Sequence, residues 1–182
     1  MNIQVRDTNI SGCYEITAPV FTDERGVLVK TFHSKTFIEQ KFNSIFCESY
    51  YTISHTNVLR GLHFQNPPED HVKVVYCVSG EIMDVVVDLR KGSSSYGKYE
   101  IFHLTQDKAN MVYIPEGLAH GYYVKSGPAI MMYQVSKAYS PTHDSGIHWS
   151  SVKIPWPNTN PVISEKDKHL PDFADFKSPF NF

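Results

Sequence analysis

A cation and a proton-transfer group lie three positions apart in residues 58–65, which read Val-Leu-Arg-Gly-Leu-His-Phe-Gln. Large apolar residues flank Arg60 and His63, as in a strand that enters a core, where a polar side chain is costly unless it is paired. Arg60 binding an anion beside His63 as a proton shuttle would explain the pattern. A structural core histidine beside a solvated arginine explains it too, and the stretch taken alone favours this second interpretation.

A second histidine, His120, closes residues 114–121, which read Ile-Pro-Glu-Gly-Leu-Ala-His-Gly. Gly117 and Gly121 lie on either side of it, and glycine permits a sharp turn or the close approach of another group. If the strands present His63 and His120 to the inside of a small barrel, the two form a polar pocket in an apolar interior. Such a pocket is the usual ligand site of a small barrel, although His120 alone is equally consistent with a structural role.

The elements that must position these residues are short strands. Apolar runs alternate with Gly, Pro, Asn and Asp from residue 45 to residue 135, which is typical of an antiparallel sandwich or barrel. We therefore expect a mainly β protein, an antiparallel jelly roll with a few short helices. Ser79-Gly80 predicts a hairpin turn, and strands are predicted at 72–78, 81–89, 99–104, 111–114, 119–124 and 129–135.

The two ends of the chain carry weaker patterns. Residues 1–33 predict short strands with a turn at 23–26, and Thr36 with Glu39 fits a capping box that starts a helix ending near Phe42. Ser164 has the character of an N-cap. Prolines preclude long helices in the tail at 158–182, which we expect to pack against the body or a partner subunit, or to fray. No repeat or second domain is visible, so residues 1–182 are predicted to form one domain.

Composition and charge exclude several classes of protein. Of 182 residues, 41% are hydrophobic and 20% are charged, which is ordinary for a soluble globular domain. A net charge of -2 gives no reason to expect binding to nucleic acid or to an anionic membrane. Three widely spaced cysteines show neither a disulfide framework nor a metal pair. Without a signal-like or membrane-spanning apolar run, the sequence predicts a cytoplasmic protein.

Further motifs fall in order along the chain. Pro115-x-Gly117-x-x-His120 resembles the second motif of the cupins. The whole ordered set is similar to the dTDP-4-dehydrorhamnose 3,5-epimerase family, over nearly the whole chain. Any single piece is weak, but the ordered set is highly specific. Its members are 23–26, 58–65, Lys73, 80–90, 114–121, Tyr133, 139–141 and 163–167.

This resemblance implies an isomerase that needs no metal or organic cofactor. It would epimerise a nucleotide-diphosphate-linked 4-keto-6-deoxy sugar, most closely dTDP-4-dehydro-6-deoxyglucose, at the carbons beside the ketone. By the same resemblance His63 is the base, and Asp167 orients it and stabilises its imidazolium. Lys73 lies near the developing oxyanion, with His120 as a second candidate there. Tyr133 is the acid on the opposite face of the sugar.

The resemblance also implies a binding site and a homodimer. Arg25 and Arg60 would hold the diphosphate, where a guanidinium fork suits phosphate oxygens. Tyr139 would flank the nucleotide, and Asp144 and Lys166 match further binding positions. The N-terminal strands within 1–33 would pair two subunits, with Arg25 reaching the partner's site. The implied role is to make an activated deoxysugar for a cell-surface polysaccharide.

The sequence departs from the family on the nucleotide side. Glu48-Ser49-Tyr50 stands where the family usually has Gln-x-Asn, and Lys30 stands where an acidic residue is common. Glu48 can only accept hydrogen bonds where glutamine can also donate. We keep Glu48 and Tyr50 as substrate-binding positions. The reaction class is then better defined than the substrate, and a mono-epimerase of a CDP- or GDP-linked sugar is an alternative.

Other classes of protein remain open from the residues. Lys73 fits a solvated strand position, Tyr133 a core tyrosine and Asp167 a capping residue. A metal-dependent cupin enzyme would use His63, His71 and His120 with Glu69, but the usual His-x-His is His63-Phe64-Gln65 here. A non-catalytic sugar-binding cupin is another alternative. A ketoisomerase of related fold is the third, because it shares the enolisation step.

Overall fold

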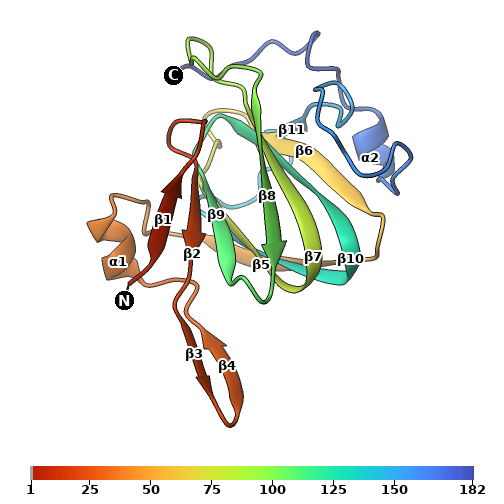
Figure 1. The fold of residues 1–182 in the computed structure, drawn as a ribbon. Helices are drawn as coiled ribbons and strands as arrows, with labels where there is room; N and C mark the ends of the chain where they lie inside the picture. The colour runs from red at the N-terminus through yellow and green to blue at the C-terminus, as the bar shows by residue number, and fades with distance from the viewer. Residues whose placement is uncertain (1) are drawn as a thin grey trace.

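The computed structural model describes residues 2–182, and β-strands make up most of it (Figure 1). Eleven strands and two short helices occur in the described residues. They are β1 (Gln4–Asp7), β2 (Tyr14–Thr17), β3 (Val20–Asp23), β4 (Gly26–Val29), α1 (Ser34–Glu39), β5 (Glu48–Ser54), β6 (Leu59–Gln65), β7 (Lys73–Asp88), β8 (Tyr99–Thr105), β9 (Asn110–Ile114), β10 (Leu118–Val135), β11 (Asp144–Gly146) and α2 (Glu165–Lys168). The predicted mainly β class with a few short helices is confirmed.

Two long strands, β7 and β10, pair antiparallel along almost their whole length and belong to both layers of the fold. The first half of β7 and the second half of β10 lie in the first sheet, in the order β1-β2-β9-β7-β10-β5. Their other halves lie in the second sheet, in the order β8-β7-β10-β6-β11. This antiparallel jelly roll matches the predicted architecture.

The passage of β7 from one sheet to the other depends on Gly80. Gly80 has φ +83°, and a Cβ there would lie 2.6 Å from the Ser126 carbonyl oxygen of β10. Glycine is therefore required for the close approach of the two strands. The hairpin predicted at Ser79-Gly80 is wrong, because both halves of β7 keep β10 as their partner and the register only shifts opposite the bend. Likewise, the strands predicted at 119–124 and 129–135 are one strand.

An apolar core lies between the sheets, and strand alternation decides which residues enter it. On β7, Val75 and Cys77 of the first sheet and Ile82 and Val86 of the second all join one buried cluster. Met83, Val85 and Val87, which alternate with them, join a second cluster on the outer side of the second sheet. The C-terminal tail covers that outer side through Phe173, Phe176 and Phe180, so the tail packs against the body of the domain.

The two short helices differ in how well their start could be predicted. α2 begins at the expected N-cap, where Ser164 Oγ accepts a hydrogen bond from the Asp167 amide. α1 does not begin at Thr36. His33 caps it by accepting from the Thr36 amide through Nδ1, and Thr36 is buried inside the first turn. The capping box predicted at Thr36 is wrong because a histidine nitrogen takes the accepting role.

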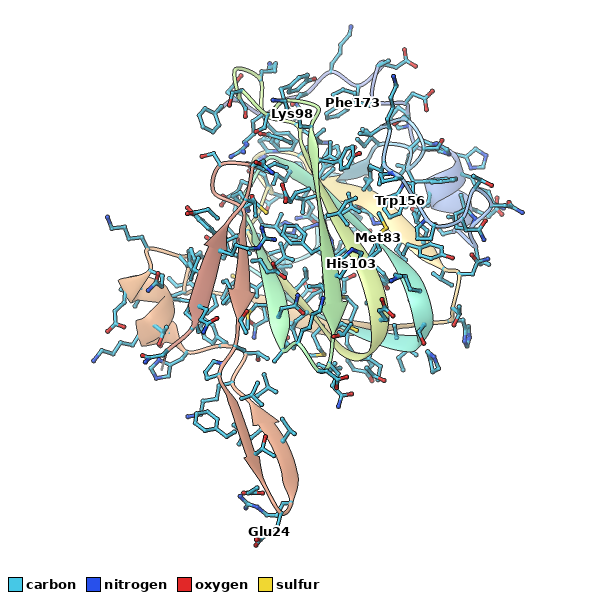
Figure 2. The ribbon with its side chains drawn as sticks, in the orientation of Figure 1. Glu24, Met83, Lys98, His103, Trp156 and Phe173 are labelled. Carbon is cyan, nitrogen blue, oxygen red and sulfur yellow. The ribbon has the colours of Figure 1, made fainter. Side chains whose placement is uncertain are left out.

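The β3–β4 hairpin projects away from the barrel as a separate two-stranded ribbon, with Glu24 at its tip (Figure 2). Its turn is the one predicted at 23–26. Four of its apolar side chains are exposed, namely Val20, Phe21, Val27 and Leu28. Neither helix in the described part of the chain has the length and apolarity needed to cross a membrane.

Candidate active site

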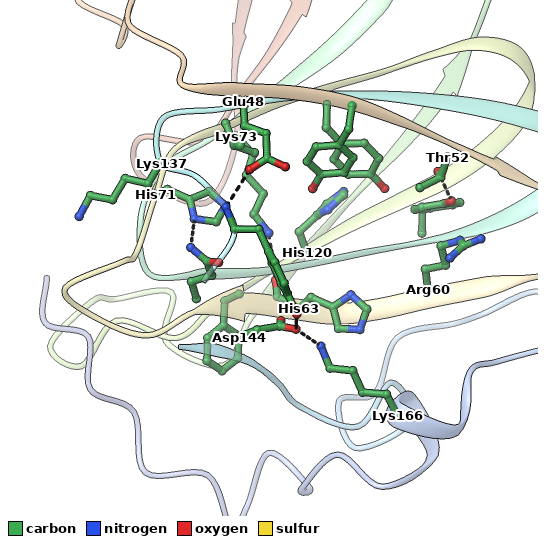
Figure 3. Close-up of a pocket in the computed structure, with 17 residues that line it drawn as sticks. Glu48, Thr52, Arg60, His63, His71, Lys73, His120, Lys137, Asp144 and Lys166 are labelled. Atoms are coloured by element: carbon green, nitrogen blue, oxygen red, sulfur yellow. Dashed lines mark hydrogen bonds and ion pairs between the residues drawn. The ribbon is translucent and has the colours of Figure 1, made fainter. Parts of the chain in front are cut away.

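A cavity of about 390 Å³ opens into the barrel between the two sheets (Figure 3). Strands β5, β6, β7 and β10 supply most of its lining, and residues from β11, α2 and the 135–140 segment complete it. Ten of the twelve residues predicted for the site line this cavity. They are Glu48, Tyr50, Arg60, His63, Lys73, His120, Tyr133, Tyr139, Asp144 and Lys166.

His63 of β6 pairs with Asp167 of α2, the eleventh predicted residue. His63 Nε2 lies 2.7 Å from Asp167 Oδ1, and the Gly61 amide donates to Asp167 Oδ2 at 3.3 Å. Burial acts to raise the pKa of Asp167, but hydrogen bonds from His63, the Gly61 amide and Ser164 outweigh it and lower the pKa. An ionised carboxylate only accepts, so Nε2 carries the proton and Nδ1 of the neutral ring is free to take one.

Lys73 is the first residue of β7. It lies on the same inward face as Val75 and Cys77, which belong to the core. Its side chain is buried, and Nζ donates to the His63 carbonyl oxygen at 3.4 Å. Burial lowers the pKa of Lys73 to about 8, although the carboxylates of Asp144 and Asp84 act in the opposite direction. A cation is thus held inside the cavity beside the backbone of His63.

His120 is tied to Asp84, a residue that the sequence analysis did not select. His120 Nε2 lies 2.7 Å from Asp84 Oδ2 across β10 and β7, and His120 pairs in register with His63. Burial raises the pKa of Asp84 despite the opposing effect of His120, and its Oδ1 has no hydrogen-bond partner among the described residues. The sequence contained a sign of this pair, because Asp84 interrupts an apolar run and a buried charge needs a partner.

Tyr133 lies on the first sheet, on the inward face of β10. It pairs in register with Tyr50 of β5, and the two rings stack with centroids 4.6 Å apart and planes 11° apart. The ring of His120 meets Tyr133 edge-on at 6.1 Å. Burial raises the pKa of the Tyr133 hydroxyl well above 10 and that of Tyr50 to about 12, so both are neutral donors at neutral pH.

Charged and aromatic residues surround the mouth of the cavity. Lys166 forms an ion pair with Asp144, and the Tyr139 hydroxyl donates to the same carboxylate at 3.1 Å. The Tyr139 amide donates to Glu48 Oε2 at 2.7 Å, which uses the acceptor character of Glu48. These contacts join β5, residues 139–144 and α2 at the entrance of the cavity.

Comparisons with known proteins agree with one another. Residues 7–175 match the family model described as dTDP-4-dehydrorhamnose 3,5-epimerase. The chain belongs to this family. An enzyme of that name from Shigella flexneri is 40% identical over 159 residues, which cover 86% of this chain and 88% of the relative. The chain is accordingly an isomerase of the epimerase type.

Two other relatives show the range within the family. A Legionella pneumophila 3,5-epimerase solved with dTDP-4-keto-L-rhamnose has a TM-score of 0.94 and 28% identity, covering 100% of this chain and 99% of that one. A Streptomyces niveus protein named dTDP-4-dehydrorhamnose 3-epimerase is 34% identical, covering 91% of this chain and 82% of the relative. Proteins named for one epimerisation and for two therefore both resemble this epimerase.

Of the two predicted site residues that do not line the cavity of this epimerase chain, Asp167 contacts His63 and Arg25 lies elsewhere. It lies at the tip of the β3–β4 hairpin, is exposed, and forms an ion pair with Asp23. Lys30 directly follows β4 at the base of the hairpin, and its Nζ lies 5.8 Å from the centre of the Phe21 ring. Arg25 thus lies outside the active-site cavity of its own chain.

The metal-site alternative finds no support in the geometry. Residues 2–182 contain no group of three or more His, Cys, Asp or Glu side chains placed to hold a metal ion. His63 and His120 each contact a separate carboxylate. His71 Nδ1 lies near the Gln65 amide nitrogen and the Glu69 backbone carbonyl.

Proposed function

We propose that this protein is a cofactor-independent 3,5-epimerase of dTDP-4-dehydro-6-deoxyglucose. One observation carries the proposal: His63, a base that Asp167 orients, and Tyr133, a neutral hydroxyl donor, line a single cavity from the two different sheets. Inversion at carbon needs a base on one face and an acid on the other. Simple binding of a sugar needs neither.

The reaction follows from the charges that these groups can carry. His63 Nδ1 removes the proton from a carbon beside the C4 ketone, and the electron pair moves into the carbonyl to form an enolate. The Asp167 carboxylate stabilises the imidazolium. The buried Lys73 cation stabilises the enolate oxygen, and His120 lies in the same cavity. Tyr133 then donates its proton to the opposite face of the carbon. Such positioned acid–base groups typically contribute about 10²–10⁴ in rate.

Both C3 and C5 lie beside the C4 ketone, so one base can serve both carbons if the ring presents each proton in turn. We propose action at both, because the Shigella flexneri 3,5-epimerase is more similar in sequence than the Streptomyces niveus 3-epimerase, at 40% against 34% identity.

The nucleotide diphosphate would occupy the mouth of the cavity. Arg60 supplies a cation for the diphosphate, and Tyr139 is 60% exposed there and free to flank the base. Glu48, Tyr50, Asp144 and Lys166 would contact the remaining nucleotide and sugar groups. The differences at Glu48 and Tyr50 would adapt this end of the site to its own substrate.

We further propose a homodimer built on the N-terminal strands. The β3–β4 hairpin exposes four apolar side chains, and a second subunit would cover them while Arg25 reaches the partner's cavity. In sedimentation velocity, the wild-type protein should run as a dimer, and Phe21→Lys with Leu28→Lys should shift it towards the monomer. A monomeric wild type at micromolar concentration would overturn the dimer. The free cysteines Cys13, Cys47 and Cys77 suit the reducing cytoplasm, where we place the protein.

The experiment for the activity is solvent-deuterium incorporation followed by NMR. The enzyme is incubated in D₂O with 4-keto-6-deoxy sugars linked to dTDP, CDP or GDP, with His63→Ala as the inactive control. Exchange at both C3 and C5 of the dTDP sugar, absent in His63→Ala, is the expected result. Exchange at one carbon would make the protein a mono-epimerase, preference for CDP or GDP would change the substrate, and no exchange with any sugar would refute the proposal.

A further inference from the structure

A row of hydroxyl groups runs beside Tyr133 in the wall of the same cavity and ends at an arginine. Arg60 Nε donates to Ser54 Oγ at 2.9 Å, and Ser54 Oγ lies 2.9 Å from the Tyr122 hydroxyl. The Tyr122 hydroxyl lies 2.8 Å from Thr52 Oγ1. Thr52 lies two residues along β5 from Tyr50, the register partner of Tyr133, and its hydroxyl acts to lower the pKa of Tyr133. Tyr122 is 1% exposed and Ser54 is 2% exposed, so these two groups are shielded from water.

The sheet register places these groups together. Tyr50, Thr52 and Ser54 alternate along β5 and share one face, and that face pairs with the face of β10 that carries Tyr133. Tyr122 comes from the other half of β10, in the second sheet, and pairs in register with Arg60 of β6. The row therefore crosses from the second sheet to the first through the interior of the barrel.

The arginine fixes the direction of the first hydrogen bond in the row, from Arg60 to Ser54. A guanidinium can only donate, whereas each hydroxyl has one proton to donate and lone pairs that accept. Ser54 accepts from Arg60 and keeps its own proton to donate. Either oxygen can be the donor between Ser54 and Tyr122 and between Tyr122 and Thr52. The order that continues from Arg60 has Ser54 donating to Tyr122 and Tyr122 donating to Thr52, which leaves the Thr52 proton for the oxygen of Tyr133. Each acceptor in turn becomes a donor, and such chains polarise one another.

We propose that Tyr122 is a positioning residue that acts through Thr52 on Tyr133: it turns the Tyr133 proton towards the sugar and stabilises the phenolate left after proton delivery. This inference rests on the proposed function, in which Tyr133 is the acid. The step is the transfer of the phenolic proton to the enolate carbon, and the electron pair of the O–H bond stays on the tyrosine oxygen. The hydroxyl row supplies hydrogen bonds to that oxygen and no additional proton.

The need for such support comes from the surroundings of Tyr133. Burial raises the pKa of its hydroxyl, and the neighbouring Tyr122, Tyr50 and Asp84 act in the same direction, whereas the hydrogen bond from Thr52 lowers the pKa. A phenolate in this site is costly unless a donor faces it. Among the groups that influence this pKa, Thr52 is the one that stabilises the anion, and it can donate its proton to Tyr133 when Tyr122 donates to Thr52.

The test separates two events that D₂O labelling reports independently. Removal of the substrate proton by His63 and its return to the same face gives exchange without inversion, whereas inversion also requires Tyr133. We expect Tyr122→Phe, which removes one oxygen and keeps the ring, to slow inversion about tenfold at saturating substrate. Exchange with retention should stay at the wild-type rate, and KM should not change.

A matched control lies at the next residue. Tyr123 is also buried, and its hydroxyl donates to Asn57 Oδ1 at 2.8 Å on the other side of the strand. Tyr123→Phe removes the same atom from the same strand and should leave both rates unchanged. Equal losses of exchange and inversion in Tyr122→Phe, or no loss of either, would overturn the proposal.

Two further variants test whether Tyr122 acts through Thr52 and Tyr133. Thr52→Ser keeps the hydroxyl and should retain inversion, whereas Thr52→Val should lose it about as much as Tyr122→Phe. Adding Tyr122→Phe to Tyr133→Phe should cause no further loss, because groups that act as one unit are not additive. A full tenfold additional loss in that background would show a separate structural role and refute the proposal. Wild-type exchange is measured alongside, and its absence would refute the proposed function instead.

Discussion

Two regions of the cavity contain the groups that change charge in the reaction. One group becomes a cation and the other an anion, and the side chains around them differ accordingly. We call His63 with Asp167 the base region, and Tyr133 with Tyr50, Thr52 and Tyr122 the acid region. The base region contains a carboxylate at 2.7 Å, which suits a group that becomes a cation. The acid region contains neutral hydroxyls and a stacked ring, which suit a group that becomes an anion. A carboxylate next to Tyr133 would oppose its reaction.

The two regions also differ in how the chain assembles them. His63 and Asp167 are 104 residues apart, and their contact depends on the docking of a helix of four residues. Tyr133 and its partners lie on strands whose register the barrel fixes. The side chain of His63 is 32% exposed, whereas Tyr133 is 7% exposed as a residue. The base region is therefore the more exposed, and the acid region the more buried.

The largest effect is expected at Lys73, which should serve both regions because it faces the enolate that they share. Lys73→Met removes the cation and keeps an unbranched chain. Exchange and inversion should both fall about 10²–10³-fold, as for the loss of an oxyanion donor. The exposed Lys108→Met is the control for the loss of one positive charge. If only inversion fell, Lys73 would belong to the acid region alone.

Asp167→Asn tests the base region by itself. The amide cannot stabilise an imidazolium as a carboxylate does, so exchange and inversion should fall together by roughly 10²-fold, within the range for acid–base groups. D₂O labelling measures both rates, and Asp172→Asn, an exposed carboxylate in the tail, is the control. Unequal losses would mean that Asp167 does not act through His63.

The pH dependence gives the next effect. Burial lowers the pKa of Lys73 to about 8, so the ammonium that faces the enolate is lost as pH rises above about 8. We expect kcat/KM to fall about tenfold for each further pH unit. Lys73→Arg should move this alkaline limb to higher pH, because a guanidinium does not deprotonate in this range. An unchanged limb in Lys73→Arg would assign it to another group.

The smallest effect is expected in the acid region at Tyr50. Tyr50→Ala removes the stacking that holds the ring of Tyr133, and aromatic pairs contribute about 0.5–1.5 kcal/mol beyond area burial. Inversion at saturating substrate should fall by up to about tenfold, with exchange unchanged. Tyr51→Ala on the opposite, exposed face of β5 is the control. Loss of exchange in Tyr50→Ala would remove the distinction between the two regions.

The strands and the polar lining of the cavity could be predicted because their signals are local or carried by ordered motifs. The ordered motifs of the family place Lys73, Tyr133 and Asp167, for which the local patterns alone fit a solvated, a core and a capping residue. The predictions that failed concern features that depend on residues far away in the sequence. Whether Gly80 turns the chain or bends it depends on β10, which is not adjacent in sequence.

The support groups were missed for a related reason. Ser54, Thr52 and Tyr122 are unremarkable in sequence, and only the register of β5 against β10 and the bend of β10 bring their hydroxyls into one row. Asp84 was the exception, since a carboxylate inside an apolar strand was visible. The position of Arg25 outside the cavity of its own chain depends on the direction of a hairpin, which no local pattern specifies.

The most direct test of the account compares Tyr133→Phe with His63→Ala in D₂O. If base and acid occupy separate regions, Tyr133→Phe should exchange the proton beside the ketone while returning deuterium to the same face, so that labelled substrate accumulates without the epimer. His63→Ala should give neither label nor epimer. A Tyr133→Phe enzyme that loses exchange along with inversion, or that still inverts at the wild-type rate, would contradict the division between the two regions.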